Sequence, residues 1–203
     1  MIKGLKMTLT EQIKNKSKSI FWVFVLILAP MWMMFIFNNI LVGGMFSQVG
    51  GVYPRTLSFL GLSGIFTSWM FHADWNHLIG NTQVILSLLL FISVFEKEPF
   101  KIIGALIVAS GVFTWLFGAS GTMHIGASGL IFAMFGYVFA SIILARRWLY
   151  IIALFVMGAD YLYCMKAGLI PQSGVSFAGH FGGLVGGILV AYLIGKMSKK
   201  EQI

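Results

Sequence analysis

Long apolar stretches separated by short polar segments run through most of the chain. They cover residues 20–41, 77–95, 102–117, 128–144, 148–165 and 179–194. A membrane-crossing helix needs about 20 predominantly apolar residues. The pattern therefore predicts an all-α polytopic membrane protein with a six-span membrane domain over 20–195. A basic segment, 1–19, precedes this domain, and a short basic tail, 196–203, follows it.

The composition supports a membrane protein and excludes several other classes. Of 203 residues, 59% are apolar and only 10% are charged, against about 25% charged residues in an ordinary soluble domain. These values exclude a soluble globular enzyme, a disordered tail and a fibrous protein. The single cysteine, Cys164, cannot form an internal disulfide or a thiolate metal cage. The first apolar stretch is longer than a signal-peptide core and has no obvious cleavage site, so we expect a retained span.

The basic residues indicate a membrane topology rather than a nucleic-acid partner. The net charge is +8, but the charges lie in clusters between the apolar stretches. Single-strand binding would instead favour a basic stripe with interleaved aromatic residues. If the N-terminus is cytoplasmic, six spans leave only Arg55 and Lys166, out of 14 basic residues, on the outer side. This asymmetry predicts that both termini are cytoplasmic.

The connection between the first two predicted spans, about 42–76, is long and rich in glycine and aromatic residues. It is too apolar for a solvated loop, so we expect it to lie in the outer interface as short helices. Loops of this length inside a compact domain are usually functional.

Five polar residues inside the predicted spans are candidate functional residues, because polar groups in a bilayer are costly. They are His77, Asn81, Ser128, Asp160 and His180. The second, fourth and sixth spans run in the same direction in the predicted topology. Four of the five residues, all except Asp160, therefore lie at one depth, near the outer ends of three parallel helices.

These four residues have the chemistry of a nucleophilic site. A serine hydroxyl becomes a strong nucleophile when a neighbouring base takes its proton, and His180 can supply that base for Ser128. A tetrahedral oxyanion needs preorganised hydrogen-bond donors. His77 and Asn81 are four residues apart on one helix face, and the start of the helix at Ser128 adds free N–H groups.

Other chemistries fit the sequence less well. A zinc metalloprotease would need a His-Glu-x-x-His motif, which the chain lacks. An aspartyl protease needs two carboxylates, and Asp160 is the only acid within a span. A metal carrier using the four histidines stays open as an alternative. Two of these, His72 and His124, are expected at the membrane interface.

One short sequence occurs twice, so the chain offers two candidate nucleophilic serines. Gly-Ala-Ser-Gly stands at 118–121 and again at 126–129. An unbroken apolar helix follows Ser128, whereas Ser120 is followed by residues typical of a loop. We therefore predict that Ser128, not Ser120, is the nucleophile.

Three motifs resemble those of the rhomboid intramembrane serine proteases. The segment 77–81, His-Leu-Ile-Gly-Asn, resembles their H-x-x-x-N motif, and 126–129 resembles their G-x-S-G motif. His180 and the glycines that follow it resemble the last-helix histidine of the family. The stretch 71–75 is similar to the family's residues before H-x-x-x-N, and the resemblance covers about residues 50–195.

The resemblance implies a six-helix core and a Ser–His dyad without an acid. Ser128 would be the nucleophile, His180 the general base, and His77 and Asn81 the oxyanion donors. Phe132 holds the place of an aromatic residue that packs on the base, but it lacks the hydroxyl of a tyrosine. A Trp-Arg pair that some members carry in the first loop is absent, and only Pro54-Arg55 is found there.

The resemblance also implies the cellular setting. The substrates would be single-span membrane proteins, cleaved near the outer face without a cofactor or metal. The lipid bilayer would be the other partner, with no role for nucleic acid, and the protein would lie in a bacterial inner membrane. The alternatives are a catalytically silent rhomboid-like protein that binds membrane clients and, less favoured, a small transporter.

Overall fold

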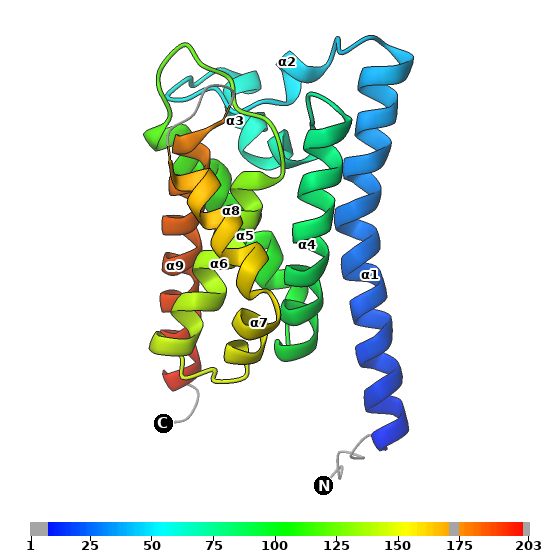
Figure 1. Ribbon diagram of the computed structural model, residues 1–203, viewed down its shortest axis with the longest axis vertical. Helices are drawn as coiled ribbons and strands as arrows, with labels where there is room; N and C mark the ends of the chain where they lie inside the picture. The colour runs from blue at the N-terminus through cyan, green and yellow to red at the C-terminus, as the bar shows by residue number, and fades with distance from the viewer. Residues whose placement is uncertain (1–7, 171–174, 201–203) are drawn as a thin grey trace, which may run out of the picture.

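The computed structural model describes residues 8–170 and 175–200, and its regular elements in these ranges are helical (Figure 1). The elements are α1 (Leu9–Phe35), a π-helical end (Ile36–Leu41), α2 (Ser47–Gly50), α3 (Phe59–Thr67), a 3-10 turn (Ser68–Met70), α4 (Trp75–Phe95), α5 (Pro99–Phe117), α6 (Ser128–Leu144), α7 (Tyr150–Val156), α8 (Gly158–Leu169) and α9 (Phe177–Lys200). An isolated antiparallel bridge joins Val52 to His124. The all-α prediction is confirmed.

The long helices form one upright bundle (Figure 1). The short helices α2 and α3 lie at the end of the bundle where α4 begins. The α4–α5 and α6–α7 connections lie at the opposite end, together with the first turn of α1 and the last turn of α9. The long loop expected between the first two spans therefore contains short helices and covers one end of the bundle.

The helices differ in how well they match the predicted spans. Within the described ranges, four are long and apolar enough to cross a membrane: Leu9–Leu41, Trp75–Phe95, Pro99–Phe117 and Phe177–Met197. Helix α6 is apolar but shorter, with 17 residues. The stretch 148–165, expected as one span, falls within two helices, α7 and α8. They are separated at Met157, where ψ is 0°, and the following Gly158 has a low helix propensity.

Helices α6 and α9 touch through their backbones. A Cβ atom added at Gly183 would lie 2.2 Å from the carbonyl oxygen of Gly129, and one at Gly187 would lie 1.9 Å from that of Ala133. Most of α6 is buried in this packing. Small residues spaced by four in α9 therefore allow the close approach that such spacing predicts.

A buried carboxylate ties several helices together at the opposite end of the bundle. Glu96, which is 3% exposed, accepts hydrogen bonds from the hydroxyls of Tyr137 and Tyr150, each 2.7 Å long, and forms an ion pair with Arg147. Lys16 of α1 donates to the Glu96 backbone carbonyl over 2.6 Å. The end of α4 is thereby joined to α1, α6 and α7.

We predict that Gly187→Ala destabilises the bundle, because the added methyl group collides with the carbonyl oxygen of Ala133. Overpacking of this kind costs about 1–3 kcal/mol, which a thermal melt in detergent would record as a lower Tm. The matched control is Gly104→Ala in α5, where a Cβ atom meets nothing within 4 Å. Equal melting temperatures for the two variants would contradict the backbone contact between α6 and α9.

A second prediction concerns Glu96→Ala, which leaves two buried tyrosine hydroxyls and Arg147 without their acceptor. Removing one partner from a buried pair costs about 3 kcal/mol or more, so chemical or thermal unfolding should reveal a large loss of stability. Glu98→Ala serves as the control, because the pair that Glu98 forms with Lys101 has side chains 64% and 78% exposed. The control should change stability by about 0.5 kcal/mol or less.

Candidate active site

Ser128 is the first residue of α6 and follows a sharply bent loop. The bend depends on Gly126, whose φ of +114° is rarely adopted by other residues. A Cβ atom there would lie 2.6 Å from the Nε2 atom of His77. The Gly126 N–H donates to the carbonyl of Ser68 over 2.9 Å. Ser128 therefore lies in the first turn of α6, whose N–H groups have no acceptor within the helix.

His180 lies in the first turn of α9 and is held in one orientation. Its side chain is buried, and its Nδ1 atom lies 2.8 Å from the carbonyl oxygen of Gly168 in α8. A carbonyl oxygen can only accept, so Nδ1 carries the proton and Nε2 of the neutral ring keeps its lone pair. Phe132 stacks on the ring, with centroids 4.4 Å apart and planes at 12°.

Gly168 fits this position because it has no side chain. A Cβ atom on it would lie 2.2 Å from the ring of Phe132 and 2.8 Å from Nδ1 of His180. Gly168 could not be identified from the sequence, because the group that contacts His180 is a backbone carbonyl. No side-chain pattern could have revealed it.

Two α4 residues, His77 and Asn81, line cavities that Ser128 also lines. Asn81 is 8% exposed, and its Nδ2 atom has no hydrogen-bond partner within the described ranges. The helix begins at a cap in which Asp74 accepts the His77 N–H over 2.9 Å. A buried amide donor with no partner is unusual. Its two N–H groups are therefore available to an acceptor in the cavity.

Two cavities meet at Ser128. An inner cavity of about 550 Å³ lies between α4, α6 and α8 and is mostly apolar, and an outer cavity of about 690 Å³ is lined by loops and helix ends. Asn81, Ser128 and His180 line both, whereas Phe132 lines the inner one and His77 the outer one. The structure therefore brings all five predicted site residues together around this junction.

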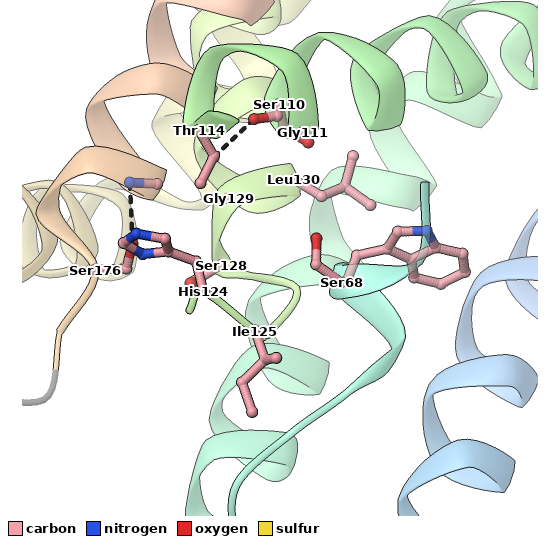
Figure 2. A pocket seen from close by; sticks show the side chains of 13 residues that line it. Ser68, Ser110, Gly111, Thr114, His124, Ile125, Ser128, Gly129, Leu130 and Ser176 are labelled. Atoms are coloured by element: carbon pink, nitrogen blue, oxygen red, sulfur yellow. Dashed lines mark hydrogen bonds between the residues drawn. The ribbon is translucent and has the colours of Figure 1, made fainter. Parts of the chain in front are cut away.

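A third, much smaller cavity lies behind Ser128 (Figure 2). Its volume is about 20 Å³, which is room for one water molecule. The hydroxyl groups of Ser110, Thr114 and Ser176 line it together with Ser128. The lining provides the several polar partners that a buried water needs.

The two remaining histidines, His72 and His124, differ in how deeply they are buried. His72 was expected at the interface but is only 1% exposed, and its Nε2 accepts the Ala127 N–H over 3.3 Å. Burial, with a smaller effect of nearby His77, lowers the pKa of His72 to about 4. His124 is half-buried, and burial lowers its pKa as well. Burial therefore favours the neutral form of both rings.

The other Gly-Ala-Ser-Gly sequence, at 118–121, lies away from this junction. Ser120 is exposed and accepts hydrogen bonds from the Arg55 guanidinium, 2.7 and 3.1 Å long. Of the two serines, Ser128 alone shares a cavity with His180 among those described above. The side chain of Asp160 lies outside the part of the chain that the structure describes.

Comparison with known proteins gives one consistent result. The Rhomboid domain matches residues 60–197, which include every predicted site residue. Uncharacterized proteins of Mycobacterium bovis and Mycobacterium tuberculosis are 34% identical over 165 residues, covering 76% of this chain and 68% of each relative. One of Mycobacterium leprae is 34% identical over 150 residues, covering 70% of this chain and 59% of the relative. The domain match spans more than half of the chain, and together with the apolar helices it identifies an integral membrane protein that belongs to the rhomboid family.

Proposed function

We propose that the chain is an intramembrane serine endopeptidase that cleaves single-span membrane proteins near the outer face of the membrane. The observation that carries this proposal is the fixed tautomer of His180. Its Nδ1 proton is held by the Gly168 carbonyl, so its Nε2 lone pair is free in a cavity that Ser128 also lines. A neutral imidazole with a free Nε2 is the form that a general base requires.

The first half of the reaction would form an acyl-enzyme. His180 Nε2 takes the Ser128 hydroxyl proton while Oγ attacks the carbonyl carbon of the scissile bond. The oxyanion accepts hydrogen bonds from the Ser128 N–H and from the Asn81 amide, with His77 beside it. The protonated His180 then gives its proton to the leaving amine, and the peptide bond breaks.

The second half would use water. His180, again neutral, takes a proton from a water molecule that attacks the ester carbon of acylated Ser128. The small cavity lined by Ser110, Thr114 and Ser176 suits a water stored close to this carbon. Collapse of the second tetrahedral intermediate releases the acid product and returns the proton to Ser128. The cycle uses no cofactor or metal.

The inner cavity suggests how a transmembrane substrate would reach Ser128. It is bordered by Val84 on α4 and by Tyr163 and Cys164 on α8, and it is mostly apolar. A helical peptide has its carbonyl groups in hydrogen bonds, so the substrate helix must unwind before attack. We infer that a substrate enters between α4 and α8 and presents an unwound segment at the junction of the two cavities.

We also infer the topology from the charge distribution. Helices α1, α4, α5, α6 and α9, with α7 and α8 together, would make six crossings. The basic connections then face the cytoplasm of a bacterial cell, as do both termini. Ser128 would lie near the outer face of the inner membrane, at the end of the bundle that carries α2 and α3.

The first test is cleavage of a single-span reporter in liposomes by the wild type and by Ser128→Ala, His180→Ala and Ser120→Ala. We expect both Ser128→Ala and His180→Ala to abolish cleavage, since each removes a group that transfers the reacting proton. Ser120→Ala should cleave as the wild type does, because Ser120 bonds Arg55 away from the cavities.

Two outcomes would contradict the proposal. Retained cleavage in Ser128→Ala would exclude this serine as the nucleophile. A wild type that neither cleaves reporters nor reacts with a fluorophosphonate would favour a silent member that binds membrane clients. Melting curves for all variants would show that lost cleavage does not come from unfolding.

A further prediction separates the oxyanion donor from the helix around it. Asn81→Ala should lower kcat by about 100- to 1000-fold, the usual effect of losing one oxyanion donor, with little change in melting temperature. The control is the adjacent Thr82→Val, which removes the hydrogen bond from Trp32 Nε1 to the Thr82 hydroxyl, 3.2 Å long. That variant should lose about 1 kcal/mol of stability while kcat is retained. An unchanged kcat in Asn81→Ala would exclude its role as a donor.

A further inference from the structure

His124 lies where three segments meet: the loop that contains Val52, the loop before α6, and the segment that begins α9. Its backbone N–H and C=O pair with Val52 over 3.0 and 2.9 Å. Both nitrogens of its ring are also engaged, Nε2 by the Thr122 hydroxyl at 2.9 Å and Nδ1 by the Ser176 hydroxyl at 2.5 Å. This side chain therefore joins the loop before Ser128 to the segment that begins α9 (Figure 2).

The directions of these hydrogen bonds follow from the groups around them. The Thr122 hydroxyl donates to the Ala119 carbonyl over 2.6 Å, so it must accept from His124 Nε2–H. The Nδ1 of the neutral ring has only a lone pair, and it accepts the hydroxyl proton of Ser176. The Ser176 oxygen in turn accepts the Gly179 N–H over 3.0 Å. One arrangement thus satisfies every polar group.

Ser176 is itself bonded to the helical turn that carries His180. Its hydroxyl caps α9 at Gly179, and its carbonyl oxygen accepts the His180 N–H over 3.0 Å. On the other side, His124 precedes Ser128 by four residues and lines the small cavity with it. The hydrogen bond between His124 and Ser176 therefore links the two chain segments that lead into the proposed nucleophile and the proposed base.

We propose that His124 is a positioning residue that holds the first turn of α9, and with it His180, in register with Ser128. The inference rests on the proposed function. The contact between Gly183 and Gly129 fixes the two helices below the site, and the bond to Ser176 fixes them above it. Losing the upper contact leaves the helices packed but frees the end of α9 that bears His180.

Two substitutions of His124 separate positioning from general stability. In His124→Asn the amide oxygen takes the place of Nδ1 and can accept from Ser176, but the bond to Thr122 is lost. In His124→Gln the longer amide reaches the place of Nε2 and keeps the bond to Thr122, but the bond to Ser176 is lost. Each variant thus loses one hydrogen bond and keeps the other.

The measurement is the rate constant for acylation of Ser128 by a small fluorophosphonate, together with the melting temperature of each full-length variant in detergent. We expect His124→Gln to lower this rate constant by about 10- to 100-fold, since small misplacements of reacting groups have effects of this size. His124→Asn should retain most of the rate. The two melting temperatures should be similar, because each variant loses one bond of similar strength.

Two further variants, Ser176→Ala and its combination with His124→Gln, test whether His124 acts through Ser176. His124→Gln should slow acylation little further when Ser176 is already replaced in Ser176→Ala, because the bond that it removes is then absent. Additive losses in the double variant would overturn the proposal. The proposal would also be overturned if the Asn and Gln variants lost acylation rate equally and in proportion to their loss of melting temperature. That result would indicate a merely structural role for His124.

Failure of the underlying function would look different. In that case the wild type itself would neither be acylated at Ser128 nor cleave a reporter, and the proposed function and this inference would fail together. A wild type that is acylated, beside a His124→Gln variant that is acylated equally fast, would overturn the role of His124 alone.

Discussion

The geometry of this molecule depends on the direct backbone contact between α6 and α9. In a bilayer, lipid tails are as apolar as the side chains, so helices associate through close packing and polar contacts. Gly183 and Gly187 permit that packing against Gly129 and Ala133. Ser128 and His180 each lie within three residues of the contact between Gly183 and Gly129. The spacing of the backbones that carry Ser128 and His180 therefore depends on two glycines, where it cannot adjust through side-chain rotation.

The bundle concentrates many of its buried polar groups at its two ends. At one end, Glu96 brings Tyr137, Tyr150 and Arg147 together. At the other, the loop before Ser128 and the starts of α4 and α9 carry the candidate site. Unpartnered polar groups are costly in hydrocarbon, and placing them at the ends brings them close to water and headgroups. The Glu96 group is fully engaged and stabilises helices, whereas the Asn81 amide is left available to a ligand.

Part of this architecture could be predicted from the sequence. The length of the apolar stretches indicated membrane-spanning helices, and the predicted common direction of three of them brought Ser128, His180, His77 and Asn81 to one depth. Three other features could not be predicted. The separation of α7 from α8 at Met157 lies inside a stretch whose overall apolar character predicted one span, and Gly158 alone did not distinguish a break from a glycine tolerated within a helix. His72 is buried where it accepts the Ala127 N–H of the loop before α6 and packs against His77, which depends on tertiary packing. Gly168 acts through its carbonyl oxygen, an atom that every residue has.

The carbonyl of Gly168 has an electrostatic consequence. In many serine hydrolases a carboxylate faces the histidine and stabilises the imidazolium that forms during reaction. A peptide dipole fixes the same ring orientation without a net charge. The resting pair of Ser128 and neutral His180 then needs no counter-ion, which suits a largely buried site such as this one, where an isolated charge is expensive. In the proposed reaction the same neutrality would give the transient imidazolium a weaker partner than a carboxylate, so an enzyme built in this way would react more slowly but would not need a buried charge.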